Sequence, residues 1–340
     1  MQIEALVAEG LEPIARQELR SFDRPIKLLD DNESGPIRFE YNGGVRALFH
    51  LRTITSLYLV SSYAVPRPRG LLGDENLRRL VDQINTVRSH HPPEAFTTLY
   101  VSAAGAETAV LQRLKEELAS RCDLTIGEDD GDLLLRLRRS VDGEGWEVLT
   151  RLTPRPLATR KWRVCNMEGA LNGTAAYTMA MLTRPHPNDL FLNIGCGSGT
   201  LLIERLFAGE ARRAIGCDND SEALACARQN IVAAGMADRC ELHSWDARAL
   251  PLPDGASGAI CGDLPFGHLV GSHDENLRLY PALLDEAARV AQPRALGVFL
   301  SHELRLMERY LDTTRFWHLE RAIKVGLGGL YPRIFILRRV

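Results

Sequence analysis

The sequence predicts an α/β protein made of two different parts, and three observations support this. Apolar strand-like runs alternate with helix-like runs from about Asp189 to the end of the chain. A glycine-rich loop, Gly195-Cys196-Gly197-Ser198-Gly199, directly follows the first of those strands. The chain has 340 residues, a length typical of two domains. We therefore expect a doubly wound α/β sheet in the second half and smaller α+β units in the first.

The first 150 residues alternate between short strands and helices. Period-two patterns predict strands over residues 2–8, 37–41, 57–65, 97–103, 132–138 and 146–152. Apolar residues at helical spacing predict helices over 11–22, 44–51, 75–88 and 107–121. Helices that fall between strands on small sheets indicate two α+β units. We place them at residues 1–65 and 66–155, on either side of a turn rich in proline and arginine.

Residues 151–167 have the composition of a connector, with two prolines, five basic residues and no acidic residue. Such a segment is either a solvated linker or a basic strip that lies against a nucleic-acid backbone. In the second case the phosphates would be contacted by Arg155, Arg160, Lys161 and Arg163. We treat residues 156–185 as a basic linker with a leading helix.

The remaining residues, 186–340, are expected to form one domain around a seven-stranded sheet. Five strands are predicted over 189–194, 212–218, 239–245, 258–264 and 295–302. The helices between and after them cover 201–208, 222–234, 275–291 and 303–311. Two further strands, 317–325 and 333–338, meet through a glycine-rich connection and should form an antiparallel pair at the sheet edge.

Composition excludes several classes of protein. Forty-one Lys and Arg residues against 44 Asp and Glu residues give a net charge of −3, which excludes a histone-like polycation. No apolar run approaches the ~20 residues that span a bilayer, and the N-terminus does not resemble a signal peptide. Seven cysteines without a C-x-x-C pair argue against a disulfide framework or a zinc ribbon and favour a reducing cytosol. We expect a cytoplasmic protein that binds neither membrane nor metal.

The glycine-rich loop has the position of a nucleotide-binding turn, because glycines let the backbone approach a ligand at a strand's carboxyl end. Asp218 and Asn219 follow the second strand, where an acidic residue binds ribose hydroxyls in dinucleotide folds. Asp246 and Ala247 follow the third strand and are placed to contact an adenine edge. NAD folds use G-x-G-x-x-G to seat a pyrophosphate. This loop reads G-x-G-x-G, which favours S-adenosylmethionine, a cofactor without phosphate.

Asp263-Leu264-Pro265-Phe266, at the end of the fourth strand, is the candidate catalytic turn. An aromatic exocyclic amine is a weak nucleophile because its lone pair is conjugated with the ring. The Asp263 carboxylate and the Leu264 carbonyl can accept both N–H bonds, with Pro265 fixing the backbone. Phe266 would stack on the base, a contact worth about 1–3 kcal/mol. The alternative is an ordinary turn at a strand end.

Five separated segments resemble the THUMP-domain RNA methyltransferases, in particular the TrmN-like branch that makes N2-methylguanosine in tRNA. They are GALNGTA (169–175), CGSGTLLIE (196–204), DLPFG (263–267), GSHDENLRLYPALLDE (271–286) and GGLYPRIFIL (328–337). The first half is similar in layout to that family's ferredoxin-like domain and THUMP domain, here residues 1–65 and 66–155. The resemblance implies a Rossmann-fold (class I) methyltransferase over 186–340. It also implies S-adenosylmethionine-dependent methylation of a guanosine N2 amine in the tRNA acceptor stem. Separately, we expect a monomer.

Two departures from the family pattern leave rival functions open. Asn193 stands where the family has an aspartate, so it keeps an acceptor but loses the charge that attracts the cofactor's ammonium. His268 and Leu269 replace two basic residues. One rival is an amino-methyltransferase acting on adenine N6 in RNA or DNA, or on glutamine. The other is an RNA-binding THUMP protein whose catalytic domain has decayed, although the intact DLPFG, Asp218 and Asp246 argue against it.

The charge distribution raises a question about where RNA would bind. Residues 1–155 carry 20 basic and 24 acidic groups, whereas residues 156–340 carry 21 and 20. The half expected to grip RNA is therefore the more acidic one. RNA should contact the connector and a restricted arginine face, with the acids directed elsewhere.

Overall fold

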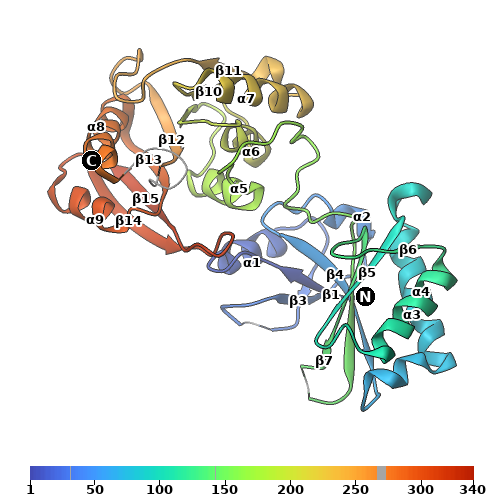
Figure 1. Ribbon diagram of the computed structural model, residues 1–340. Helices are drawn as coiled ribbons and strands as arrows, with labels where there is room; N and C mark the ends of the chain where they lie inside the picture. Colours follow the sequence, from blue (N-terminus) through green and yellow to red (C-terminus); the bar gives the residue numbers. More distant parts are fainter. Residues whose placement is uncertain (31, 142, 266–272) are drawn as a thin grey trace. The chain divides into compact units, whose positions relative to one another are not determined.

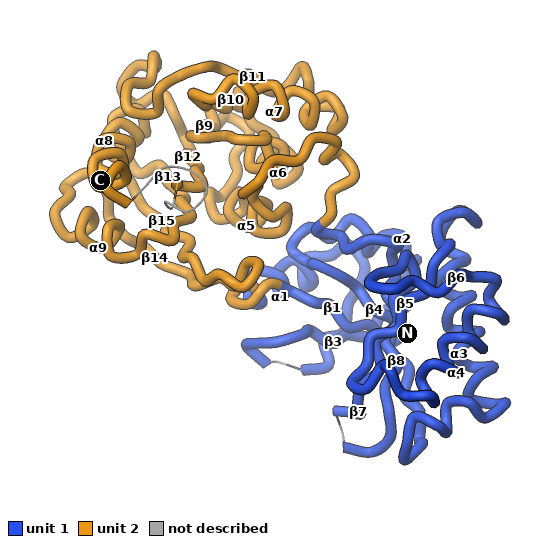
Figure 2. Tube along the Cα trace, viewed as in Figure 1, with its two compact units in different colours: residues 1–7, 12–158 blue, residues 8–11, 159–340 orange. Residues whose placement is uncertain are grey.

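The structure is a computed structural model that describes residues 1–30, 32–141, 143–265 and 273–340 (Figure 1). The chain divides into two compact units (Figure 2). Unit 1 comprises residues 1–7 and 12–158, and unit 2 comprises residues 8–11 and 159–340. No helix in the described ranges is long and apolar enough to cross a membrane.

Unit 1 is built on an eight-stranded sheet of order β2-β3-β1-β4-β8-β7-β5-β6. Its strands are β1 (Gln2–Leu6), β2 (Lys27–Leu28), β3 (Ile37–Glu40), β4 (Ser56–Tyr63), β5 (Thr98–Ala103), β6 (Thr125–Ile126), β7 (Leu133–Arg139) and β8 (Trp146–Arg151). Its α-helices are α1 (Glu12–Arg20), α2 (Val45–Leu48), α3 (Asp74–Arg88) and α4 (Ala109–Cys122). Because β4 pairs with β8, the two expected α+β units share one continuous sheet. The boundary at residue 65 stays a prediction.

The two faces of this sheet differ because side chains alternate along each strand. Ile3 and Ala5 belong to the main core of unit 1. The helices α3 and α4, which lie side by side in Figure 1, contribute buried apolar residues to the same core. The intervening residue, Glu4, lies on the opposite face. That face holds a small apolar cluster and a group of four buried or half-buried charged side chains from β1, β3, β7 and β8: Glu4, Arg38, Arg138 and Glu147.

Unit 2 contains a seven-stranded sheet of order β11-β10-β9-β12-β13-β15-β14, which confirms the predicted doubly wound fold. Its strands are β9 (Leu190–Ile194), β10 (Arg213–Cys217), β11 (Cys240–His243), β12 (Ser257–Asp263), β13 (Ala291–Ser301), β14 (Trp317–Lys324) and β15 (Arg333–Arg339). β9 to β13 are mutually parallel where they pair, and β15 runs antiparallel between β13 and β14, as predicted for the edge. The strand order reverses between β9 and β12, and ligands bind at such a switch point.

Helices cover both faces of the second sheet. They are α5 (Gly173–Leu182), α6 (Thr200–Ala208), α7 (Ser221–Ala233), α8 (His273–Val290) and α9 (Leu304–Thr313). α8 and α9 pack with Ile260 and Phe299 in one core cluster. Cys261, the next residue of β12, points the other way and its Sγ lies 3.9 Å from the Met179 carbonyl oxygen in α5.

One disulfide joins two parts of unit 2, so the expectation of reduced cysteines is wrong for this pair. Cys165, in the segment before α5, is bonded to Cys226 in α7 across 61 residues of sequence. Asn230, one turn along α7, accepts hydrogen bonds from the backbone N–H groups of Val164 and Cys165, both at 2.9 Å. The segment is therefore fixed to α7 by backbone contacts as well, a proximity that cysteine spacing in the sequence cannot reveal.

Candidate cofactor and amine site

The glycine loop begins where β9 ends, at the switch point of the sheet. Gly195 and Gly197 have φ values of 58° and 50°, a left-handed conformation that residues with a Cβ rarely adopt. A Cβ built at either position meets no heavy atom within 4 Å. Cys196 and Ser198 are buried beneath the loop, and burial raises the pKa of the Cys196 thiol. The loop thus presents bare backbone to open space, as a closely approaching ligand requires.

Asp218 lies against this loop, as the sequence predicted for a ribose-binding carboxylate. Its Oδ2 accepts a hydrogen bond from the Gly197 N–H at 2.8 Å, and its Oδ1 accepts one from the Asp220 N–H at 3.0 Å. Asp220 caps α7 by accepting from the Glu222 N–H at 2.8 Å, so Asp218 is left to face the loop. Asn219, between them, is exposed.

Asp246 and Ala247 follow β11 at the same edge of the sheet. Asp246 is exposed, and hydrogen bonds from Arg248 lower the pKa of its carboxyl group. The Arg248 backbone N–H donates to Oδ1 at 2.9 Å and the guanidinium donates to Oδ2 at 2.7 Å. Ala247 is half-buried against the α8 core. A cofactor's adenine edge would therefore meet a carboxylate that is held in place.

Five buried side-chain oxygen atoms lack a hydrogen-bond partner within the described part of the chain, and two of them lie on neighbouring strands: Asn193 Oδ1 in β9 and Asp263 Oδ1 in β12. Asn193 is completely buried, and its Nδ2 donates to the Cys261 carbonyl at 3.3 Å. The two strands are neighbours, with Asn193 opposite Cys261, two residues before Asp263. Buried acceptors of this kind need donors. A cofactor amino group and a substrate amine would supply them, so the residues fit S-adenosylmethionine and an amine substrate.

Asp263 ends β12 with its carboxyl group largely removed from water. Burial raises the pKa of this group from its ordinary value to about 7. The next residue, Leu264, is anchored because its N–H donates to the Leu300 carbonyl of β13 at 2.9 Å. The Leu264 carbonyl accepts no hydrogen bond from the residues described in the structure. The predicted pair of acceptors, one carboxylate and one backbone carbonyl, therefore stands at the end of β12. Phe266, with the following residues to 272, lies outside the described residues.

Two residues that the sequence reasoning did not assign to the site hold this turn from α8. The Tyr280 hydroxyl donates to the Pro265 carbonyl at 2.7 Å, and Asn276 Nδ2 donates to the same oxygen at 2.9 Å. Tyr280 and Asn276 are completely buried, and the Tyr280 hydroxyl also bonds to Ser301 Oγ at 3.0 Å. Sequence analysis placed both in the segment 271–286 that resembles the family. Their i,i+4 spacing could have suggested a shared target.

The four connector residues expected to bind phosphates do not form one exposed strip. Arg160 is buried, 2.8 Å from Glu204 of α6, an ion pair that commits its guanidinium to the protein interior. Arg163 is half-buried and donates to the Leu171 carbonyl at 2.7 Å and to Thr200 Oγ1 at 2.9 Å. These two arginines fasten the connector to α6, which contradicts a phosphate role for Arg160. Lys161 is exposed in unit 2, and Arg155 is exposed in unit 1, where it pairs with Asp130 at 2.8 Å.

A glycine loop at the switch point, a carboxylate after the second strand and a turn with two available acceptors after the fourth form the arrangement expected of a domain that uses S-adenosylmethionine. The chain belongs to the UPF0020 family, described as RMKL-like, methyltransferase domain, which matches residues 160–333. This match begins within the connector, includes the strands that carry the loop and the turn, and ends at the first residue of β15.

A relative and two solved structures extend this result. The chain is 31% identical over 184 residues to a protein of Bos taurus named tRNA (guanine(6)-N(2))-methyltransferase THUMP3. That alignment covers 50% of this chain but only 36% of the relative's own length. The crystal structure of TrmN from Thermus thermophilus matches with a TM-score of 0.76 at 22% identity, over 100% of this chain and 99% of that one. The crystal structure of SMU.472 complexed with SAH matches with a TM-score of 0.66 at 14% identity, over 98% and 97%.

Proposed function

We propose that this protein transfers a methyl group to the exocyclic N2 amine of a guanosine in tRNA, in the acceptor stem. The observation that carries the proposal is the turn at the end of β12, where neither the buried Asp263 Oδ1 nor the Leu264 carbonyl accepts a hydrogen bond from any residue that the structure describes. An exocyclic amine has the two N–H groups that these acceptors need. The name of the Bos taurus relative supports tRNA and guanine N2 as the substrate.

In this mechanism the chain's own residues orient the amine. The Asp263 carboxylate accepts one N–H bond and the Leu264 carbonyl accepts the other, which directs the nitrogen lone pair away from the ring plane. Tyr280 and Asn276 fix the Pro265 carbonyl and so hold the turn's shape. When bound, S-adenosylmethionine would supply an electrophilic methyl group to the amine. The Asp263 carboxylate or water would take the proton that the methylated amine releases.

The cofactor would be held by residues at the carboxyl edge of the sheet. The loop 195–199 offers backbone N–H and carbonyl groups, and Asp218 with Asn219 would accept the ribose hydroxyls. Asn193 Oδ1, which has no partner among the described residues, would accept a hydrogen bond from the amino group of the cofactor. Asp246 and Ala247 would contact the adenine. Each assignment rests on the position of the residue around the loop and on the chemistry of its side chain.

We propose that unit 1 binds tRNA and consists of a ferredoxin-like domain followed by a THUMP domain. The match to TrmN over the whole chain supports a similar fold for unit 1. We further propose a monomer that acts in the cytoplasm, where tRNA is modified. Gel filtration with light scattering measures the molar mass in solution and so tests whether the protein is a monomer.

The decisive experiment incubates the protein with unmodified tRNA and methyl-labelled S-adenosylmethionine, followed by digestion and mass spectrometry of the nucleosides. N2-methylguanosine is expected, whereas methyladenosine would select the rival amino-methyltransferase. Asp263→Ala should abolish incorporation. Asp238→Ala removes an exposed carboxylate just before β11, at the amino edge of the sheet, and should leave it unchanged. Incorporation by wild type that does not exceed the Asp263→Ala background would contradict the proposal.

A further inference from the structure

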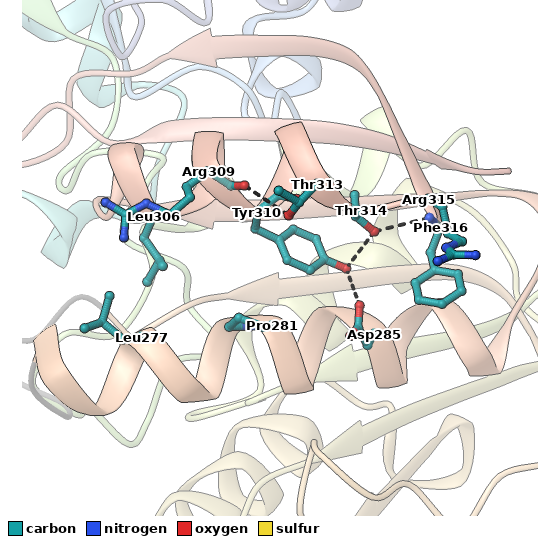
Figure 3. Close-up of a pocket in the computed structure, with 10 residues that line it drawn as sticks. All are labelled: Leu277, Pro281, Asp285, Leu306, Arg309, Tyr310, Thr313, Thr314, Arg315 and Phe316. Carbon is teal, nitrogen blue, oxygen red and sulfur yellow. Dashed lines mark hydrogen bonds between the residues drawn. The ribbon is translucent and has the colours of Figure 1, made fainter.

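A groove runs along the seam between α8 and α9 in unit 2. It consists of two adjoining hollows of about 330 Å³ and 490 Å³, which share Leu277, Leu306 and Arg309. Figure 3 shows Leu277, Pro281 and Asp285 projecting from α8 toward α9, with Arg309 and Arg315 at opposite ends of the smaller hollow. The larger hollow continues to His273 and Glu303. None of these residues is a predicted cofactor ligand.

Three arginines on this groove are exposed: Arg305 and Arg309 on consecutive turns of α9, and Arg315 just after it. None of them forms an ion pair with any residue that the structure describes. Like charges at i and i+4 repel each other on a helix, so this placement costs stability without a ligand. The acids of the groove are engaged elsewhere. Asp285 accepts from the Tyr310 hydroxyl at 2.8 Å, and Glu303 lies 3.0 Å from His273.

The groove also exposes apolar and aromatic surface between the arginines. Leu277 is 40% exposed and Phe316 is 37% exposed, both high values for large apolar side chains. Phe316 stands beside Arg315, and the guanidinium of Arg339 lies 5.5 Å from its ring centroid. Exposed aromatic rings interleaved with unpaired arginines are characteristic of surfaces that bind single-stranded nucleic acid, since rings stack on bases and arginines contact phosphates.

The groove starts next to the amine-accepting turn. The first turn of α8 carries both Leu277, in the wall of the groove, and Asn276, which donates to the Pro265 carbonyl. Asn276 Nδ2 also lies 3.5 Å from Glu303 Oε1, in the larger hollow. A polynucleotide whose base is held at Asp263 would therefore pass the mouth of this groove.

From these contacts we infer that the α8–α9 groove binds the stretch of tRNA next to the target nucleotide, which unpairs from the acceptor stem when the target base is extruded. Arg305, Arg309 and Arg315 contact its phosphates, and Phe316 stacks on one of its bases. The inference rests on the proposed function for the identity of the substrate. It places part of the RNA-binding surface on the catalytic unit, in the less acidic half of the chain.

The test compares Arg305→Gln/Arg309→Gln with a matched control, Arg212→Gln/Arg239→Gln. The control arginines are also exposed and without an ion pair in the described ranges, but they lie before β10 and β11, at the opposite edge of the sheet. We measure tRNA binding by fluorescence anisotropy at several salt concentrations, together with kcat and KM for tRNA. The groove variant should weaken binding about 10-fold and lower the salt slope by about 1.4, the loss of two phosphate contacts. Its kcat at saturating tRNA should stay within about two-fold of wild type.

Phe316→Ala should weaken tRNA binding about 5-fold or more without changing the salt slope, because stacking releases no counterions. If the groove variant and the control behave alike in binding and KM, the inference is overturned while the proposed function stands. If the groove variant loses tRNA affinity but wild type makes no methylated nucleoside, the proposed function fails and the RNA groove stands. A wild-type protein that does not bind tRNA overturns both.

Discussion

At the scale of single residues, the chemistry depends on how the end of β12 is buried. In the proposed mechanism Asp263 accepts an N–H bond, which its protonated form does poorly, yet burial raises the pKa of this carboxyl group to about 7. At neutral pH the carboxyl group of Asp263 is therefore partly protonated. The same burial means that its acceptor oxygen is already desolvated before the substrate binds. Perturbed carboxyl groups of this kind are typical of functional sites.

The pH dependence of catalysis follows from Asp263. The kcat/KM for the cofactor, which reports the free enzyme, should rise with pH and level off above about 7, because the carboxylate form becomes populated there. Asp263→Asn keeps one acceptor oxygen, so its activity should fall on the order of 10²-fold and lose this inflection. Initial rates between pH 5.5 and 9 provide the measurement. An Asn variant with the same inflection as wild type would assign the titration to another group.

Tyr280 is expected to act through the turn and not on the reacting atoms. Tyr280→Phe removes the hydroxyl that donates to Pro265, so kcat should fall about 10-fold while KM for the cofactor stays constant. Tyr310→Phe is the matched control, because it removes another buried hydroxyl, bonded to Asp285, from the same helix pair. Its kcat at saturating tRNA should match wild type. Equal kcat losses in the two variants would indicate general destabilisation of the α8–α9 region.

At the scale of elements, strand alternation places charges on one face of the unit 1 sheet. Glu147 in β8 is 1% exposed and accepts from Arg38 at 2.9 Å and from Arg138 at 3.1 Å. Burial alone would raise the pKa of Glu147, but hydrogen bonds from Arg38 and Arg138 hold it below its ordinary value. This network connects four strands that come from both expected N-terminal domains. It therefore couples those strands into one sheet.

Breaking this network should cost far more stability than breaking an exposed pair. Glu147→Gln leaves two arginines facing a neutral group, and we expect it to lower the free energy of unfolding by about 3 kcal/mol. Glu40→Gln disrupts the exposed pair with Lys27 in the same sheet and should cost less than about 1 kcal/mol. Urea denaturation measures both. Because the pKa of Glu147 is lowered in the folded state, its contribution should be present at neutral pH and be lost as pH falls below about 4.5. Similar losses in the two variants would contradict a buried network.

The Cys165–Cys226 bond determines how many thiols the protein contains. Five of the seven cysteines are free in the structure, namely Cys122, Cys196, Cys217, Cys240 and Cys261. Labelling in denaturant without reductant should therefore modify five thiols, and labelling after reduction should modify seven. In the chain-entropy description, closing a loop of 61 residues contributes roughly 4 kcal/mol. Reduction should accordingly lower the thermal midpoint of unit 2. Seven reactive thiols without reductant would show that the pair is reduced in solution.

At the scale of the whole molecule, two separate cores divide the chain. The core of unit 1 packs α1, α3 and α4 on one sheet, and the core around α8 and α9 belongs to unit 2. Every predicted cofactor ligand lies in unit 2. In our proposal the cofactor is thus bound by unit 2 alone, whereas tRNA is bound by unit 1 and also by the α8–α9 groove of unit 2.

Calorimetry should resolve this division. We expect two unfolding transitions, because each unit has its own core. S-adenosylmethionine at 100 times its Kd should stabilise one transition by about 2.7 kcal/mol and leave the other unchanged. Glu147→Gln should lower the midpoint temperature of only one transition, the one that S-adenosylmethionine does not stabilise. A single transition that both perturbations move would mean that the units unfold cooperatively.

Much of the fold and site was predictable from local patterns. The seven-stranded sheet of unit 2 follows from hydrophobic periodicity, and the positions of Gly195, Asp218 and Asp263 follow from counting strand ends. The two-residue strands β2 and β6 escaped prediction because such short strands have no detectable period. Tyr280 and Asn276 escaped assignment because their target, the Pro265 carbonyl, lies on a different element.

The sequence by itself therefore determined the class of fold, the order of its elements and which loops hold polar groups at the edge of the sheet. These properties depend on residues that are near one another along the chain. Only the tertiary structure decided which charges are free. It buries Arg160 against Glu204, leaves Arg305 and Arg309 exposed in the α8–α9 groove, and joins Cys165 to Cys226. The physical reason is that burial and pairing depend on contacts between distant residues, which a local pattern does not contain.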